Sequence, residues 1–97
     1  MEGQASISHE ILASYAADAA REVEGVRGLS DGLLPRRGGV RVSGTDGALR
    51  IELHLVVEWG ASIPLLGRTV QERVWDYVGR MTDLRIEAVD VVVDEIS

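Results

Sequence analysis

The feature of this sequence that most restricts its fold is an alternation of apolar and polar residues between positions 48 and 59. Large apolar residues occupy every odd position of ALRIELHLVVEW, and most even positions carry polar or charged side chains. Successive side chains of a β-strand point to opposite faces, so this pattern predicts a strand with one buried and one solvated face. A shift of one residue would expose the whole apolar row, so the register must be well fixed. The predicted buried row is Leu49, Ile51, Leu53, Leu55, Val57 and Trp59.

A helix is predicted before this strand. Ser8 is a suitable N-cap, and Glu10 lies in the first turn, where an acidic side chain interacts favourably with the helix dipole. Apolar residues follow at helical spacing from Ile11 to Val23. Gly25 is expected to end this helix, because glycine commonly follows the last helical residue.

A second helix is predicted from about Pro64 to Thr82. Proline is tolerated at the first helical position, and it disfavours the helical conformation of the residue before it. Ile63 is therefore expected to lie outside the helix. The predicted apolar row is Leu66, Val70, Val74, Tyr77 and Met81, with Val78 at its edge.

Three other segments are expected to complete a sheet. Residues 26–34 predict a short, irregular or bulged strand because they contain two glycines, and residues 40–43 predict a second strand. GTDG at 44–47 predicts a hairpin turn. The last strand spans about 86–94. Its two predicted faces are Val89, Val91 and Val93, and Asp90, Val92 and Asp94.

The predicted element order is α-β-β-β-α-β. Two helices and one apolar sheet face favour an arrangement in which both helices cover that face and the other stays open to solvent. We therefore predict an α+β fold, a two-layer sandwich with two helices packed on one face of a small mixed sheet of three or four strands. A chain of 97 residues predicts one domain, residues 1–97, with a flexible N-terminus at 1–6.

Composition excludes several classes of function. Sixteen acidic and ten basic residues give a net charge of −6, whereas nucleic-acid-binding proteins normally carry a basic patch. The same charge disfavours adhesion to anionic lipid. The absence of cysteine removes thiolate metal sites and cysteine nucleophiles. We find no signal peptide and no apolar run of the ~20 residues that a membrane span needs, so a cytoplasmic protein without direct membrane insertion is expected.

The turn WGASIP, residues 59–64, joins the long strand to the second helix, an arrangement also found in phosphate-binding sites. Such sites use several free backbone N–H groups, usually supplied by glycines, and often a nearby Lys or Arg. This turn has one glycine, and Pro64 lacks an N–H. Arg68 can reach an anion, but nothing else converges on it. We interpret the turn as a connector.

The two histidines do not form a catalytic arrangement in the sequence. His9 lies in the first turn of a helix and His54 on the solvated face of the long strand, and neither has an adjacent Ser nucleophile. His54 shares its face with Glu52 and Glu58, which permits a weak surface metal site. A cross-strand pair on a solvated sheet is the favoured interpretation. No catalytic, cofactor-binding or metal-binding residue is predicted.

Five residues are candidate contacts to a protein partner. Trp75 lies roughly 130° around its helix from the apolar row, near Arg68, and either binds a partner or folds onto the rim of the core. Val56 and Val92 project from the open sheet face among acidic residues. If their strands are neighbours, they form a small apolar surface there. The candidates are Val56, Val92, His54, Trp75 and Arg68.

Several segments together resemble the alkaline shock protein family, the envelope stress response proteins of Gram-positive and related bacteria. They are ISHEILASYAADAAREVEGVRGLSDG, GVRV, LRIELHLVVEWGASIPLLGRTVQERVWDYV and MTDLRIEAVDVVVDEI. The distinctive parts are the opening helix, which ends in E-V-E-G-V-R-G-L, the junction L-V-V-E-W-G-A-S-I-P, and the final V-x-V-x-V strand. The resemblance covers about residues 6–94.

The resemblance implies a non-enzymatic, cytosolic protein of cell-envelope homeostasis without an established cofactor. Similar proteins self-associate, some are held at the membrane by a separate membrane-anchored partner, and some are linked to control of fatty-acid synthesis. We therefore expect a protein-binding or self-assembling scaffold, with itself and a membrane-anchored envelope protein as partners. The alternative is a ligand-responsive regulator of fatty-acid or envelope metabolism. It would bind a small anion at Arg68 or in the loop cluster Arg36, Arg37 and Arg41.

Overall fold

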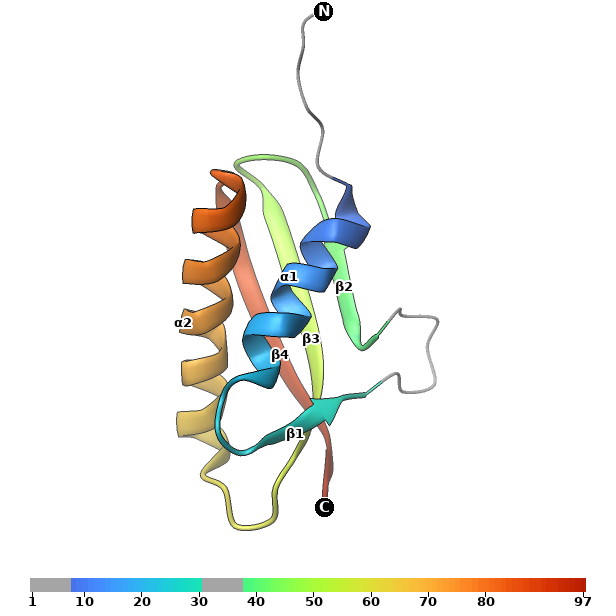
Figure 1. Cartoon of the computed structure of the whole chain (residues 1–97), viewed down its shortest axis with the longest axis vertical. Helices are drawn as coiled ribbons and strands as arrows, with labels where there is room; N and C mark the ends of the chain where they lie inside the picture. The colour runs from blue at the N-terminus through green and yellow to red at the C-terminus, as the bar shows by residue number, and fades with distance from the viewer. Residues whose placement is uncertain (1–7, 31–37) are drawn as a thin grey trace, which may run out of the picture.

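The computed structural model describes residues 8–30 and 38–97. The predicted N-terminal segment 1–6 and most of the loop before the second strand, Arg36 and Arg37 included, lie outside these residues. The order α-β-β-β-α-β is confirmed (Figure 1). The elements are α1 (His9–Arg21), β1 (Val26–Leu29), β2 (Val40–Ser43), β3 (Leu49–Val57), α2 (Ile63–Thr82) and β4 (Ile86–Ile96).

The long strand β3 is the centre of a mixed sheet. β1 and β2 are both antiparallel to it, and β4 is parallel. Leu53 pairs with Val40 of β2 and with β4, while Leu55 pairs with Leu29 of β1 and again with β4. A strand has only two edges, so β1 and β2 lie end to end along the edge opposite β4. The short first strand therefore does pair, with an irregularity between Val26 and Gly28.

Both helices lie on one face of this sheet, as predicted (Figure 1). The apolar row of β3 from Leu49 to Val57 is at most 2% exposed and forms the floor of the core. α1 contributes mainly alanines, and these small side chains allow it to lie close to the sheet. The two helices touch through Tyr15 and Tyr77, whose ring centroids are 6.0 Å apart in an edge-to-face arrangement.

The start of α1 follows its local sequence signal, whereas the end of α1 and the start of α2 differ from the prediction. Ser8 caps α1 and accepts a hydrogen bond from Ile11 N at 3.2 Å, as predicted. α1 ends at Arg21, four residues before Gly25, whose φ of +100° instead lets the chain turn into β1. Ile63 belongs to α2, contrary to the prediction, with Ser62 as the N-cap. Element ends often differ by one residue in this way.

The buried row of α2 differs from the predicted one at its C-terminal end. Val78 is fully buried, whereas Met81 is 49% exposed and Tyr77 half-buried. The buried residues of α2 are spaced by four, and such rows form the ridges along which helices commonly pack. This row is Leu66, Val70, Val74 and Val78.

Trp59 was expected in the core, and this prediction is wrong. β3 ends at Val57, and the side chain of Trp59 is 83% exposed. Gly60 follows with a φ of +90°, so the chain is already turning toward α2. The alternation of apolar residues in the sequence continues to Trp59, two residues beyond the end of β3, where it no longer indicates burial.

Candidate functional site

The sheet face opposite the helices carries three of the five predicted partner contacts. No helix of the described segments covers this face. β3 and β4 are neighbours, and Val92 is the register partner of His54. Val92 is 38% exposed and Val56 is half-buried. The condition that the strands of the two valines are neighbours is therefore met.

His54 is placed on this face but is not solvated, so that part of the prediction is wrong. The residue is only 8% exposed. Its Nδ1 lies 3.0 and 3.1 Å from the two carboxylate oxygens of Asp94 on β4, and its Nε2 lies 2.5 Å from Oε2 of Glu52. The two carboxylates flank the imidazole ring on both sides, and the contact with Asp94 links β3 to β4.

This arrangement restricts the chemistry of His54. An imidazole donates from both nitrogens only when it is doubly protonated, and two adjacent carboxylates favour that charged form. A ring held on both nitrogens offers no lone pair to a metal or to a proton donor. Among the described residues, no group of three His, Cys, Asp or Glu side chains is arranged to hold a metal ion. The cluster Glu52–His54–Asp94 is best suited to joining the two strands.

We expect His54→Leu to lower the free energy of unfolding by about 1–3 kcal/mol, because Glu52 and Asp94 each lose a donor. Urea denaturation followed by circular dichroism measures this change. His9→Leu is the control. It removes an exposed contact, to Gly44 O at 3.0 Å, and should change stability by about 0.5 kcal/mol or less. Equal effects of the two substitutions would show that the cluster adds no stability.

Trp75 and Arg68 lie in the helix layer, apart from the three contacts on the sheet face. Trp75 is 47% exposed, and Arg68 is exposed. Gln71, one turn before Trp75, donates from Nε2 to the Val89 carbonyl of β4 at 3.0 Å. The five candidates therefore belong to two surfaces and do not form one site.

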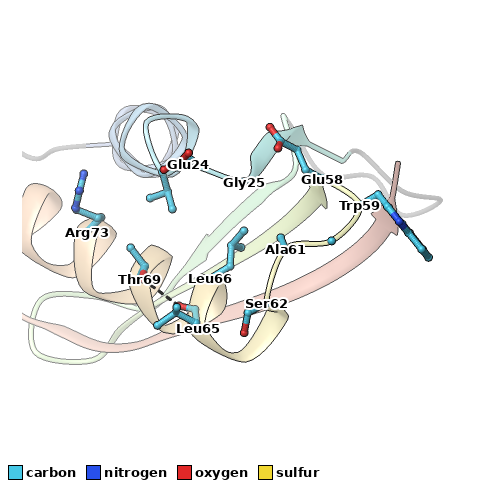
Figure 2. Close-up of a pocket in the computed structure, with 12 residues that line it drawn as sticks. Glu24, Gly25, Glu58, Trp59, Ala61, Ser62, Leu65, Leu66, Thr69 and Arg73 are labelled. Atoms are coloured by element: carbon cyan, nitrogen blue, oxygen red, sulfur yellow. Dashed lines mark hydrogen bonds between the residues drawn. The ribbon is translucent and has the colours of Figure 1, made fainter.

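A groove that the sequence analysis did not predict lies at the β3–α2 turn. Its volume is about 580 Å³, and it is bounded by the α1–β1 turn, the β3–α2 turn and the start of α2 (Figure 2). Apolar side chains line its middle, and Leu65 on its rim is 64% exposed. The turn interpreted as a connector is thus also one wall of a cavity. The large or methyl-bearing apolar residues that line it are Val23, Trp59, Ala61, Leu65 and Leu66.

Three charged residues line the same groove. Glu24 comes from the α1–β1 turn, Glu58 from the end of β3 and Arg73 from α2. None of the three forms an ion pair within residues 8–30 and 38–97. The Glu58 N–H donates to the Gly25 carbonyl at 2.8 Å, which joins two walls of the groove. The groove therefore combines an apolar centre with both signs of charge.

Comparison with known proteins agrees with the resemblance seen in the sequence. Residues 1–97 match the model of the alkaline shock protein 23 family, which is described as having a cell envelope-related function. The chain is also 33% identical over 99 residues to the uncharacterized protein YqhY of Bacillus subtilis (strain 168). This match covers 92% of the chain and 73% of YqhY.

Solved structures of the MamM CTD share the fold. A zinc form matches with a TM-score of 0.59 at 21% identity, covering 91% of this chain and 87% of that one. A manganese form matches with a TM-score of 0.58 at 20% identity, and the match covers 91% of this chain and 99% of that one. At this level of identity the likeness extends to the fold alone. Across the helices that the structure describes, none combines the length and apolar character needed to cross a bilayer.

Proposed function

Because the chain belongs to the alkaline shock protein family, whose function is related to the cell envelope, we propose that it is a non-enzymatic scaffold of the envelope stress response. It binds copies of itself and a membrane-anchored envelope protein, which recruits it from the cytoplasm to the membrane. The histidine most shielded from solvent, His54, is held on both ring nitrogens, which supports a role without catalysis.

The observation that carries this proposal is the exposure of large apolar side chains around the β3–α2 turn. Trp59 is 83% exposed and Leu65 is 64% exposed, although burying either side chain would lower the free energy of the system. Tryptophan is enriched in the central contacts of protein interfaces, and grouped apolar residues on a surface mark binding sites. Val92 on the open sheet face provides a second, smaller apolar contact.

Val92→Asp is expected to weaken association through the open sheet face while the fold stays intact, and Val56→Asp should act in the same direction. A carboxylate placed beside Asp90 and Asp94 adds both charge repulsion and a desolvation cost. Light scattering over a range of protein concentrations measures the change in mass. Thr45→Asp, which adds the same charge at an exposed position of the turn between β2 and β3, is the control. The same mass for the wild type and all three variants at every concentration would exclude this face from self-association.

The membrane part of the proposal is tested in the native cell. The tagged protein is crosslinked in place, the cells are fractionated, and its neighbours in the membrane and cytosolic fractions are identified. A membrane pool that disappears when one small membrane protein is deleted supports the scaffold. An exclusively cytosolic pool bound to a biosynthetic enzyme contradicts it and favours a regulator.

The groove favours a second candidate function, a ligand-responsive regulator of fatty-acid or envelope metabolism. Its volume of about 580 Å³ falls within the ~300–1,000 Å³ typical of small-molecule sites. The cation that lines it is Arg73, whereas Arg68 does not line it. A regulator predicts that an acidic metabolite raises the melting temperature of the wild-type protein but not of Arg73→Gln. A scaffold does not require such a shift.

A further inference from the structure

The edge of β4 that faces away from β3 is unpaired. β4 pairs with β3 on one side, no other strand within residues 8–30 and 38–97 pairs with it, and α2 runs beside it (Figure 1). We propose that this edge binds an extended segment of a partner protein as an added strand, and that the segment alternates basic and apolar residues. This inference rests on the proposed function, because it names the surface that binds a partner and the chemistry of that partner.

Gln71 of α2 shows which backbone groups of β4 face away from β3. Its Nε2 donates to the Val89 carbonyl at 3.0 Å, so a side-chain amide stands where the N–H of a neighbouring strand would donate. Backbone groups along a strand point alternately to its two edges, so those of Val91 and Val93 point the same way as those of Val89. An added strand can therefore bond to Val91 and Val93, and it can replace the exposed Gln71 side chain at Val89.

β4 lacks several features that protect edge strands from further pairing. It is 11 residues long and contains neither proline nor lysine. Its pairing with β3 is regular from Ala88 to Val93, and the register shifts only after Val93. On the α2 flank beside this edge, one turn before Gln71, an added Cβ at Gly67 would meet nothing within 4 Å. Space for an added strand is thus open beside the regular part of β4.

Trp75 lies on the same flank of α2, one turn after Gln71. At roughly 100° per residue, it is about 40° around the helix from Gln71. The side chain is 47% exposed. A strand that extends along β4 past Gln71 brings an apolar side chain against the indole and buries both surfaces. This contact accounts for a tryptophan outside the core.

The side chains of β4 determine the composition of the added strand. Its charged residues are all acidic, and they lie on the open sheet face, where Asp90 is the register partner of Glu52 and Asp94 contacts His54. The alternate residues, Val89, Val91 and Val93, face the helices and contact the core. Side chains of adjacent strands meet on the same face, so basic residues suit the open face and apolar residues suit the helix face.

Charge argues against a second copy of β4 in this position. Two such edges side by side would place acidic residues beside acidic residues on one face, and like charges so placed are destabilising. Each chain also carries a net charge of −6. A basic segment removes both costs. Its basic side chains would lie on the sheet face opposite the helix layer, and so apart from Arg68 of α2.

The first test measures the binding of three synthetic peptides of about eight residues to the whole chain by fluorescence anisotropy. One peptide alternates Lys and Val, and the second alternates Glu and Val. The third is the Lys–Val peptide with methylated backbone nitrogens, which keeps the charge but has no N–H donors. The Lys–Val peptide should bind at least about 10-fold more tightly than either of the others. Equal binding of the methylated peptide would show that charge alone suffices, and would overturn strand addition.

Hydrogen exchange followed by nuclear magnetic resonance locates the bound peptide. The Lys–Val peptide should slow exchange of the Val91 and Val93 amides, because they become hydrogen-bonded. The Asp90 and Val92 amides point toward β3 and are the internal control. Unchanged exchange at Val91 and Val93 would overturn the site. Slowing that appears without peptide and grows with protein concentration would assign the edge to a second copy, and would also overturn the inference.

Asp90→Asn tests the charge with a matched control. Asp90 pairs with Arg50 at 3.5 Å, and Asp76 on α2 pairs with Arg80 at 3.1 Å, so Asp76→Asn makes the same change in another exposed ion pair. Asp90→Asn should weaken binding of the Lys–Val peptide at least about 3-fold, and Asp76→Asn should leave it nearly unchanged. Equal effects would mean that the peptide responds only to net charge, which contradicts the proposed face.

Failure of this inference is distinguishable from failure of the proposed function. If the Lys–Val peptide does not bind, the edge is not the proposed site. The native-cell fractionation then decides the scaffold independently, because recruitment by a membrane partner through another surface does not require strand addition.

Discussion

Leu53→Ala is expected to lower the free energy of unfolding by about 2–5 kcal/mol, the range for truncating a fully buried leucine. Leu53 is 0% exposed and lies in the middle of β3, where it pairs with Val40 on one side and Val91 on the other. Strands on both sides and helices above restrict how far the structure can close around the cavity. Small domains are stable by only about 5–15 kcal/mol, so this is a large fraction of the total.

The measurement is urea denaturation followed by circular dichroism, with Leu65→Ala as the control. Leu65 undergoes the same chemical change at a site that is 64% exposed, so its effect should stay within about 0.5 kcal/mol. A similar loss for both variants would mean that the β3 row is not the core. Leu65→Ala also separates stability from association, because Leu65 lines the rim of the groove.

Gly44→Ala is expected to have the second large effect, through the hairpin between β2 and β3. Gly44 has a φ of +87°, which costs a residue with a side chain roughly 1–2 kcal/mol. An added Cβ would also lie only 2.2 Å from the Ala48 carbonyl oxygen, a backbone atom fixed by the hairpin. We expect this overlap to cost about 1–3 kcal/mol more.

Gly47→Ala isolates the steric part of this cost. Gly47 has nearly the same φ, +89°, but an added Cβ there meets nothing within 4 Å. Its substitution should therefore show the backbone cost alone, about 1–2 kcal/mol. Comparable losses at the two glycines, measured by thermal and urea unfolding, would show that the hairpin moves to accept the Cβ of Gly44→Ala.

The placement of Trp59 has a direct consequence for how the domain works. A tryptophan in the core would contribute to stability, whereas a tryptophan that is 83% exposed is available for the binding that we propose. Trp59→Ala is therefore expected to reduce association with little effect on unfolding. Leu53→Ala should act mainly on unfolding. The two substitutions are thus expected to show that, within residues 48–59, Leu53 acts on folding and Trp59 acts on association.

The architecture of this protein could be predicted from local sequence signals. These signals sufficed for the long strand, whose period of two is independent of its partners, and for the N-cap at Ser8 and the turn at 44–47. Both helices could be placed on one sheet face because the long strand has a single continuous apolar row that must be covered. These features depend on the chemistry of neighbouring residues, and that information lies within a short stretch of chain.

The candidate sites, in contrast, depend on how distant segments meet. The environment of His54 depends on Asp94, forty residues away, and on the register between β3 and β4. The groove requires two turns to meet, one after α1 and one before α2. Trp59 continues the apolar alternation, yet it lies outside the core because β3 ends at Val57. Each of these properties is set by the folded chain as a whole, and periodicity along one segment carries no information about where another segment comes to lie.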